Sequence, residues 1–239
     1  MPRATDADRL AELQASFLAE ARTYGVLPLD DRRVERFNSD LAGRPQLIRG
    51  TSQVLYEGMG RLGEGAVINV KNKSHAVTAQ VVVPEAGAKG VIIAQGSAFG
   101  GWSLYVHEGR PTYCYNLFGL RRFKIRGAAA LPSGEHQVRV EFAYDGGGLA
   151  KGGGVSLYVD GALAGEGRVD ATEPMIFSAD ETTDVGRDTG TAVSDDYAAE
   201  ANAFTGSIRW VQIDLGPDAQ DADHFISPEE RLRVVMARQ

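Results

Sequence analysis

Apolar residues near the N-terminus recur at every third or fourth position. Six residues follow this spacing: Leu10, Leu13, Phe17, Leu18, Ala21 and Tyr24. On a helix such positions fall on one face. Thr5 or Asp6 can cap the start of that helix, and Gly25 can close its end. The pattern therefore predicts one amphipathic helix over residues 6–24.

From about residue 46 the period of the apolar positions changes to two. It is clearest in three runs, which span residues 75–83, 138–144 and 155–159. Each run has one apolar face, as a half-buried antiparallel strand requires. Turn residues such as Pro132-Ser133-Gly134 and Asp160-Gly161 separate the runs, and no helical pattern interrupts them. We therefore predict a mainly β fold, a two-sheet antiparallel β-sandwich (jelly roll) over residues 46–216.

The C-terminal residues return to a helical pattern. Ser227 stands at the N-cap, Pro228 at the first helical position and Glu230 three residues after the cap, which makes a capping box. A narrow apolar face follows, made by Leu232, Val235 and Met236. The chain is thus expected to have three parts: residues 1–45 (helix and connector), 46–216 (sandwich) and 217–239 (acidic segment and helix).

Charge and composition exclude several classes of partner. The formal net charge of −7 opposes binding to nucleic acid, which depends on a basic surface. No apolar stretch approaches the roughly 20 residues of a membrane helix. The first ten residues, MPRATDADRL, lack the apolar core of a signal peptide. An export signal is therefore expected upstream or not at all, and the location stays open between cytoplasm and periplasm.

The motifs of common active sites are incomplete in this sequence. Gly58-Met59-Gly60-Arg61-Leu62-Gly63 matches a dinucleotide fingerprint, but the residues after it predict a strand where the fingerprint needs a helix. The four histidines lack metal-binding spacing, and no Ser stands in G-x-S-x-G. The paired carboxylates of a glycosidase on this fold are also missing. We therefore predict no catalytic residue in the chain.

Acidic residues crowd into one predicted loop. They are Asp180, Glu181, Asp184, Asp188, Asp195 and Asp196. Hard oxygen ligands at this density are typical of Ca²⁺ sites, so these six are the candidate metal ligands. The EF-hand spacing is absent. The alternative is a solvated acidic loop, or one that forms salt bridges with a neighbouring domain.

Two groups of residues are candidates for binding a ligand. Arg122, Lys124 and Arg126 share one face of a predicted strand and would suit an anionic ligand such as a sulfated sugar. Trp102 and Tyr115 lie in aromatic-rich runs, and exposed aromatic rings stack on sugars. The alternatives are the solvated face of a strand for the basic residues and the core for the aromatic ones.

One predicted strand is apolar on both faces. In residues 208–213, Trp210 stands on the face opposite Val211 and Ile213. A strand of this kind usually has a cover on its outer side, either the chain's own helices or another domain. Trp210, with Leu13 and Phe17 of the N-terminal helix, is therefore a candidate for a domain interface.

Longer stretches of the sequence resemble a known family. Val159-Asp160-Gly161 ends one strand and Phe204-Thr205-Gly206 precedes another, as in the concanavalin-like, laminin-G-type jelly roll. More specifically, the chain resembles the C-terminal portion of bacterial arylsulfatases of the alkaline-phosphatase-like superfamily. The stretches that carry this resemblance are YGVLPLDDRRVERF, KNKSHAVTAQV, GVIIAQGSAFGGWSLY, YCYNLFG, FSADETTDVGRDTGTAVSDDY and ISPEERLRVVMARQ.

The resemblance implies an accessory domain without catalysis of its own. In that family a cysteine in C-x-P-S-R becomes formylglycine beside a Ca²⁺ site, in a catalytic part upstream of the matching stretches. Cys114 lacks this context, because Tyr115-Asn116-Leu117-Phe118 follows it. Residues 1–45 are then a remnant of the catalytic part, the chain needs no cofactor, and it is expected to be inactive alone.

Two functions follow from the resemblance. In the first, the domain docks on a sulfatase catalytic domain, or on a second copy of itself, and shapes substrate access. The acidic loop would then lie at the rim that faces the catalytic domain. In the second, the chain is a free-standing, lectin-like carbohydrate-binding module. Trp210 favours docking, whereas the aromatic and basic residues favour binding of a sugar.

Overall fold

The computed structural model describes residues 5–43, 45, 47–219 and 223–236. Eleven strands lie in these residues: β1 (Ser52–Leu55), β2 (His75–Val83), β3 (Gly90–Ser97), β4 (Gly100–His107), β5 (Arg110–Leu117), β6 (Arg121–Arg126), β7 (Gly134–Tyr144), β8 (Lys151–Val159), β9 (Ala162–Ala171), β10 (Thr183–Val185) and β11 (Ser207–Leu215). The helices are α1 (Asp6–Thr23), α2 (Ser39–Ala42) and α3 (Pro228–Met236), with short 3-10 turns η1 (Val34–Phe37), η2 (Glu64–Ala66) and η3 (Gly216–Ala219).

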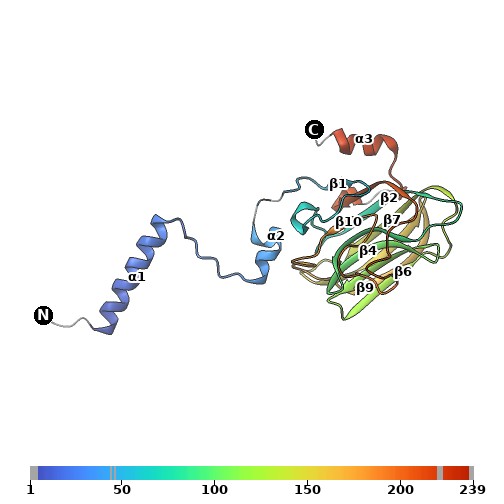
Figure 1. Ribbon diagram of the computed structural model, residues 1–239. Helices are drawn as coiled ribbons and strands as arrows, with labels where there is room; N and C mark the ends of the chain where they lie inside the picture. Colours follow the sequence, from blue (N-terminus) through green and yellow to red (C-terminus); the bar gives the residue numbers. More distant parts are fainter. Residues whose placement is uncertain (1–4, 44, 46, 220–222, 237–239) are drawn as a thin grey trace.

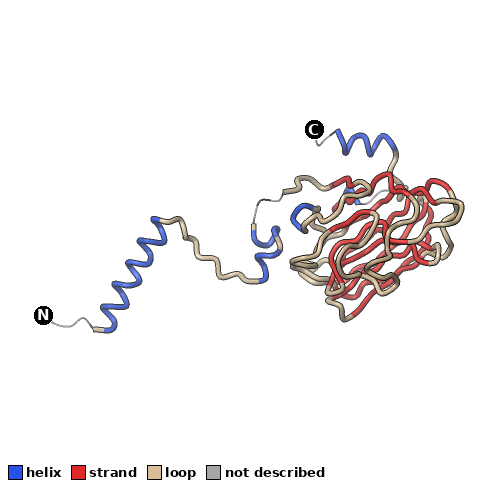
Figure 2. The backbone as a smooth tube through the Cα atoms, in the orientation of Figure 1, coloured by secondary structure: helices blue, strands red, loops and turns tan. Residues whose placement is uncertain are grey.

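The strands form two antiparallel sheets packed face to face, as the sequence predicted (Figures 1 and 2). The six-stranded sheet has the order β1-β11-β2-β7-β8-β9, and the five-stranded sheet has the order β10-β3-β4-β5-β6. All the pairs within these sheets are antiparallel. The predicted mainly β sandwich with flanking helices is therefore confirmed.

The core lies between the two sheets and follows the two-residue period. Val77, Val81 and Val140 point inward from the six-stranded sheet. Trp102 and Leu104 meet them from the five-stranded sheet. These side chains are at most 1% exposed, so nearly all of their apolar surface is removed from water. Burial stabilises by roughly 25 cal/mol for each Å² of apolar surface, which makes this layer the main source of stability.

The outer face of the six-stranded sheet is covered by the chain's own C-terminal segment. Gln137 on β7 exchanges two hydrogen bonds with the main chain of Ile226, at 2.8 and 2.9 Å. The Arg231 guanidinium lies 5.7 Å from the centre of the Trp210 ring, which is only 5% exposed. The prediction that Trp210 faces a missing partner is therefore wrong, because residues after the sandwich supply the cover.

Helix α1 stands apart from the sandwich at the end of an extended connector (Figure 1). Its capping box joins Thr5 and Asp8, and the helix ends one residue before the predicted boundary. Leu13 and Phe17 are 57% and 51% exposed, so the predicted apolar face is unpartnered in this chain. Among the described helices, none is both long and apolar enough to cross a membrane.

Candidate functional site

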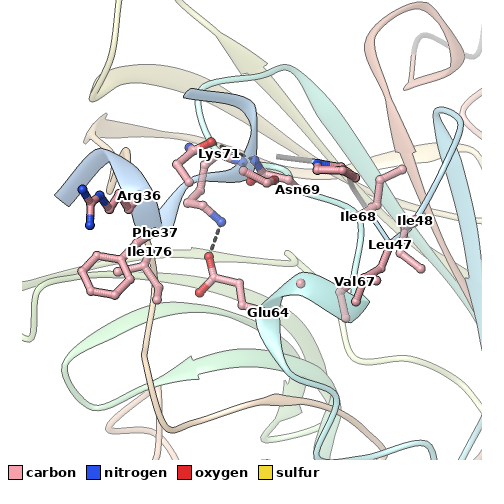
Figure 3. Close-up of a pocket in the computed structure, with 14 residues that line it drawn as sticks. Arg36, Phe37, Leu47, Ile48, Glu64, Val67, Ile68, Asn69, Lys71 and Ile176 are labelled. Atoms are coloured by element: carbon pink, nitrogen blue, oxygen red, sulfur yellow. Dashed lines mark hydrogen bonds and ion pairs between the residues drawn. The ribbon is translucent and has the colours of Figure 1, made fainter. Parts of the chain in front are cut away.

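A cleft of about 740 Å³ opens where the connector reaches the sandwich (Figure 3). The 3-10 turn η1 and helix α2 form one wall, and η2 with the extended residues after it forms the other. Its polar lining includes Arg36, Asn38, Glu64, Asn69 and Lys71, and its apolar lining includes Phe37, Leu47, Ile48, Val67, Ile68 and Ile176. A concave surface that combines apolar walls with a few polar groups is the usual form of a small-ligand site.

A buried ion pair forms the floor of this cleft. Lys71 is 5% exposed, and its ammonium pairs with the carboxylate of Glu64 across the cleft (Figure 3). The other oxygen of Glu64 accepts a hydrogen bond from the Phe177 main chain at 2.9 Å. The Lys71 ammonium also lies 4.8 Å from the centre of the Phe177 ring. Both charges are thus compensated within the chain, as buried charges must be.

Two asparagines fasten the connector to the sandwich beside the floor. Asn38, at the start of α2, donates to the carbonyl of Pro174 at 2.8 Å. The side-chain oxygen of Asn38 caps α2 by accepting from the main-chain N–H of Asp40. Asn69 donates to the Asp40 carboxylate at 3.0 Å, and Lys73 pairs with the same carboxylate at 2.6 Å. These bonds hold η1 and α2 in place as one wall of the cleft.

The outer wall of the cleft is apolar and open to water. Phe37 and Leu47, which line the cleft, are 55% and 78% exposed (Figure 3). An exposed aromatic ring in a cleft that polar side chains also line suits a ligand with one apolar face and several hydroxyl groups. Sequence reasoning missed this cleft, because its two walls are separated by about 30 residues and neither contains a recognisable motif.

The acidic residues predicted as metal ligands are divided among separate hydrogen-bond networks. Asp184 accepts from the Arg61 main chain at 2.7 Å and from the Thr189 hydroxyl at 2.6 Å. Asp188 accepts from the Tyr197 hydroxyl at 2.7 Å, and burial raises the pKa of this carboxyl to about 6. In the part of the chain that the structure describes, no three His, Cys, Asp or Glu side chains gather to hold a metal ion.

Glu181 and Asp180 occupy the start of the same acidic loop. The Glu181 carboxylate accepts from the Thr191 hydroxyl at 2.6 Å and from the Thr191 main-chain N–H at 2.9 Å. Asp180 is exposed, and its main chain donates to the Ser178 hydroxyl at 3.3 Å. These contacts are local, and they shape the loop from within.

The predicted basic stripe pairs with the predicted acidic loop. Lys124 lies 2.5 Å from both Asp195 and Asp196. Arg126 pairs with Asp196 at 3.7 Å and with Glu108 at 3.0 Å. The stripe is thus largely neutralised by the chain itself, and the loop's bonds are with its own sandwich.

Arg122 binds the main chain of the same loop: its guanidinium donates to the Val193 carbonyl at 3.0 Å. Val193 packs on Tyr105 and Cys114 on the outer face of the five-stranded sheet. Burial raises the pKa of the Cys114 thiol to about 12. This cysteine is therefore a small buried residue, as its sequence context indicated.

The two aromatic candidates lie in the core. Trp102 is 1% exposed, and its indole donates to Gln95 at 2.9 Å. Tyr115 is 4% exposed, and its hydroxyl accepts from the main chain of Glu173 at 2.7 Å. Stacking on a sugar requires an exposed ring face, and neither Trp102 nor Tyr115 has one.

Comparison with known proteins gives relatives in fold only. No family model matches the chain, and no curated protein matches its sequence. Among solved structures, the CBM40 of Ruminococcus gnavus IT-sialidase, bound to α2,3-sialyllactose, has a TM-score of 0.45 and 16% identity; the match covers 75% of this chain and 96% of that one. Domains LG4-5 of the mouse laminin α1 chain match with a TM-score of 0.40 and 19% identity, over 72% of this chain and 41% of theirs.

A third similar structure is a SAP-like pentraxin from Limulus polyphemus, with a TM-score of 0.39 and 13% identity over 68% of this chain and 75% of its own. At these identities the likeness concerns the fold alone. The two sheets described above define a β-sandwich of the concanavalin-like, laminin-G-like jelly-roll class, which is the class that the sequence predicted.

Proposed function

We propose that this chain is a non-catalytic, lectin-like jelly-roll module, and that it serves as the C-terminal accessory domain of an arylsulfatase. In this role it docks on the catalytic domain and shapes the access of substrate. The sequence resemblance supplies the family. The observation that carries docking is the exposed apolar face of α1.

The apolar surface that α1 exposes to water is larger than expected for a helix without a binding partner. Leu10, Leu13 and Phe17 are each more than half exposed and follow one another at helical spacing. Burying one such side chain stabilises by about 1.5–3 kcal/mol, so a cover over all three would be strongly favourable. Soluble proteins rarely expose a contiguous apolar patch of this kind unless it is an interaction site.

The lack of a catalytic role has its own support. The only cysteine, Cys114, has a buried thiol with a raised pKa and lacks the sequence context of a formylglycine precursor. A buried thiol in apolar surroundings is inert as a nucleophile. The chemical step would therefore belong wholly to the catalytic domain.

Docking can be tested with two variants of α1. The probe is the separately expressed catalytic part of a bacterial arylsulfatase whose C-terminal portion resembles this chain in the stretches quoted above, and its binding is measured by biolayer interferometry. Leu13→Ser with Phe17→Ser is expected to weaken binding at least tenfold, or about 1.4 kcal/mol. Glu12→Ser with Ala19→Ser changes two exposed residues on the opposite face of the helix and should leave the affinity unchanged. Equal affinities for the two variants would contradict docking through α1.

A second candidate function is binding of carbohydrate in the cleft beside α2. The observation that favours it is the exposed Phe37 ring in a cleft that polar side chains also line. Sugar rings pack their C–H faces on aromatic rings, whereas their hydroxyl groups bond to polar side chains. This function is compatible with docking, because the cleft and α1 are separate surfaces.

Calorimetric titration tests this second function. The probes are α2,3-sialyllactose, lactose and a sulfated chondroitin disaccharide. If the cleft is the site, one of them binds, and Phe37→Ala weakens that binding about tenfold, or about 1.4 kcal/mol. Phe225→Ala, which removes another partly exposed ring, should not change it. Binding that survives Phe37→Ala would place the sugar elsewhere.

A further inference from the structure

Two neighbouring turns at one end of the five-stranded sheet carry large apolar side chains in water. Phe99 lies in the turn between β3 and β4, and Phe118 and Leu120 lie in the turn between β5 and β6. They are 75%, 52% and 87% exposed. Side chains of this size at the tips of tight turns are unusual, since polar residues normally occupy such positions.

The two turns are locked to each other by a buried amide. Asn116, which is fully buried, donates to the carbonyls of Ser97 and Ala98 at 2.9 and 3.0 Å. Its own oxygen accepts from the main chain of Gly119 at 3.0 Å. The three apolar side chains are therefore presented on a rigid support, which lowers the entropic cost of binding them.

The backbone at Phe118 is strained. Its φ is 53°, in the left-handed region that a bulky residue rarely adopts. Its N–H donates to the carboxyl of Glu173 at 2.6 Å, and Glu173 is only 1% exposed. The second oxygen of this carboxyl has no hydrogen-bond partner among the described residues. Backbone strain at Phe118 thus coincides with an unpaired buried polar atom on the residue that binds its N–H. Such features are typical of functional positions.

The same end of the sandwich holds the root of the N-terminal arm. Glu173 fixes Phe118, and the next residue, Pro174, accepts the hydrogen bond from Asn38 that anchors α2. Two consecutive residues, Glu173 and Pro174, therefore bind the turn that carries Phe118 and the connector that leads to α1. A domain bound to α1 is tethered to this end of the sandwich.

We infer that Phe99, Phe118 and Leu120 form a second docking surface, and that its occupant is the catalytic domain that covers α1. This inference rests on the proposed docking function. A folded domain fits better than a sugar, because the three side chains stand on projecting turns, whereas sugar sites are concave. One large partner also covers both α1 and the turns, and two linked contacts bind more tightly than either alone.

The test compares two sets of substitutions in the full chain. Phe99→Ser, Phe118→Asn and Leu120→Ser together remove the apolar surface, and asparagine tolerates the left-handed backbone at position 118. The control is Leu163→Ser, which alters a leucine of similar exposure on β9, at the other end of the sandwich. Binding to the same arylsulfatase catalytic part is expected to weaken at least tenfold for the triple variant and less than twofold for the control.

The outcomes separate this surface from the proposed function. If the wild-type chain binds and the triple variant binds equally well, the second surface is refuted and docking through α1 stands. If the wild-type chain does not bind at all, docking itself is refuted. Light scattering adds a third outcome: a wild-type dimer that the triple variant loses would make a second copy the occupant. Phe118→Asn alone repeats the measurement should the triple variant fail to fold.

Discussion

Replacement of Arg139 by alanine is expected to lower the free energy of unfolding by about 3 kcal/mol, which is the scale of leaving two buried polar groups without their donor. Arg139 lies on β7 and is 1% exposed. Its guanidinium donates to the Glu141 carboxylate at 2.7 Å and to the Thr78 hydroxyl at 2.9 Å. A third bond, at 2.9 Å, reaches the Ala219 carbonyl in the C-terminal segment.

The loss of Arg139 acts at three places at once. It leaves the Ala219 carbonyl and the Thr78 hydroxyl without this donor, and an unpaired buried polar group costs about 1–3 kcal/mol. It also weakens the attachment of the segment that covers Trp210. Glu141 keeps the imidazole of His224 as a partner at 2.8 Å, so its charge is not stranded.

Urea denaturation at neutral pH measures the effect, with Arg168→Ala as the control. Arg168 is 53% exposed and pairs with Asp145 at the surface, so its loss should cost less than about 1 kcal/mol. Tryptophan fluorescence should change mainly in the Arg139 variant, because Trp210 loses part of its cover. If the two variants lose the same stability, Arg139 does not fix the C-terminal segment.

The strands could be predicted from the sequence because their signal is local. In β2 and β7 the alternation of apolar with polar residues identifies the face that packs in the core, although Thr78, Gln137 and Arg139 on the opposite face are buried as well. The contacts between distant segments could not be predicted in this way. Lys124 and Asp196 are separated by 72 residues, and nothing in either stretch alone indicates that they pair. The basic stripe and the acidic loop therefore suggested two separate sites.

The sequence left open whether Trp102 and Tyr115 are exposed or lie in the core. Trp102 and Tyr115 alternate with small residues in their strands, and which face lies inside depends on the second sheet. Trp210 is covered by residues that follow the sandwich, so its environment is set by the path of the C-terminal segment. Glu173 lies after β9 in a stretch that carries no motif, and a glutamate in such a position suggests exposure.

Glu173 is expected to make the stability of the protein fall as the pH rises from about 4.5 to about 8. Burial raises the pKa of its carboxyl from 4.5 to about 8, against the opposing effect of the Phe118 N–H. Repulsion from Glu64 adds to the rise of this pKa, whereas Lys71 lowers it. Between the two pKa values the folded state binds the proton and the unfolded state has lost it, so unfolding becomes more favourable with increasing pH.

Glu173→Gln removes this titration and keeps an acceptor for the Phe118 N–H. Below pH 4.5 the variant and the wild type should therefore have similar stability, because the wild-type carboxyl is protonated in both states. At pH 8 the variant should be more stable by on the order of 2 kcal/mol, since it buries no charge. Urea denaturation from pH 4 to pH 8.5 measures both curves, and Glu135→Gln, at a surface carboxyl that is 57% exposed, is the control. If the free energy of unfolding depends on pH in the same way for Glu173→Gln and the wild type, the folded protein holds this carboxylate ionised. The Phe118 N–H would then donate to a charged group.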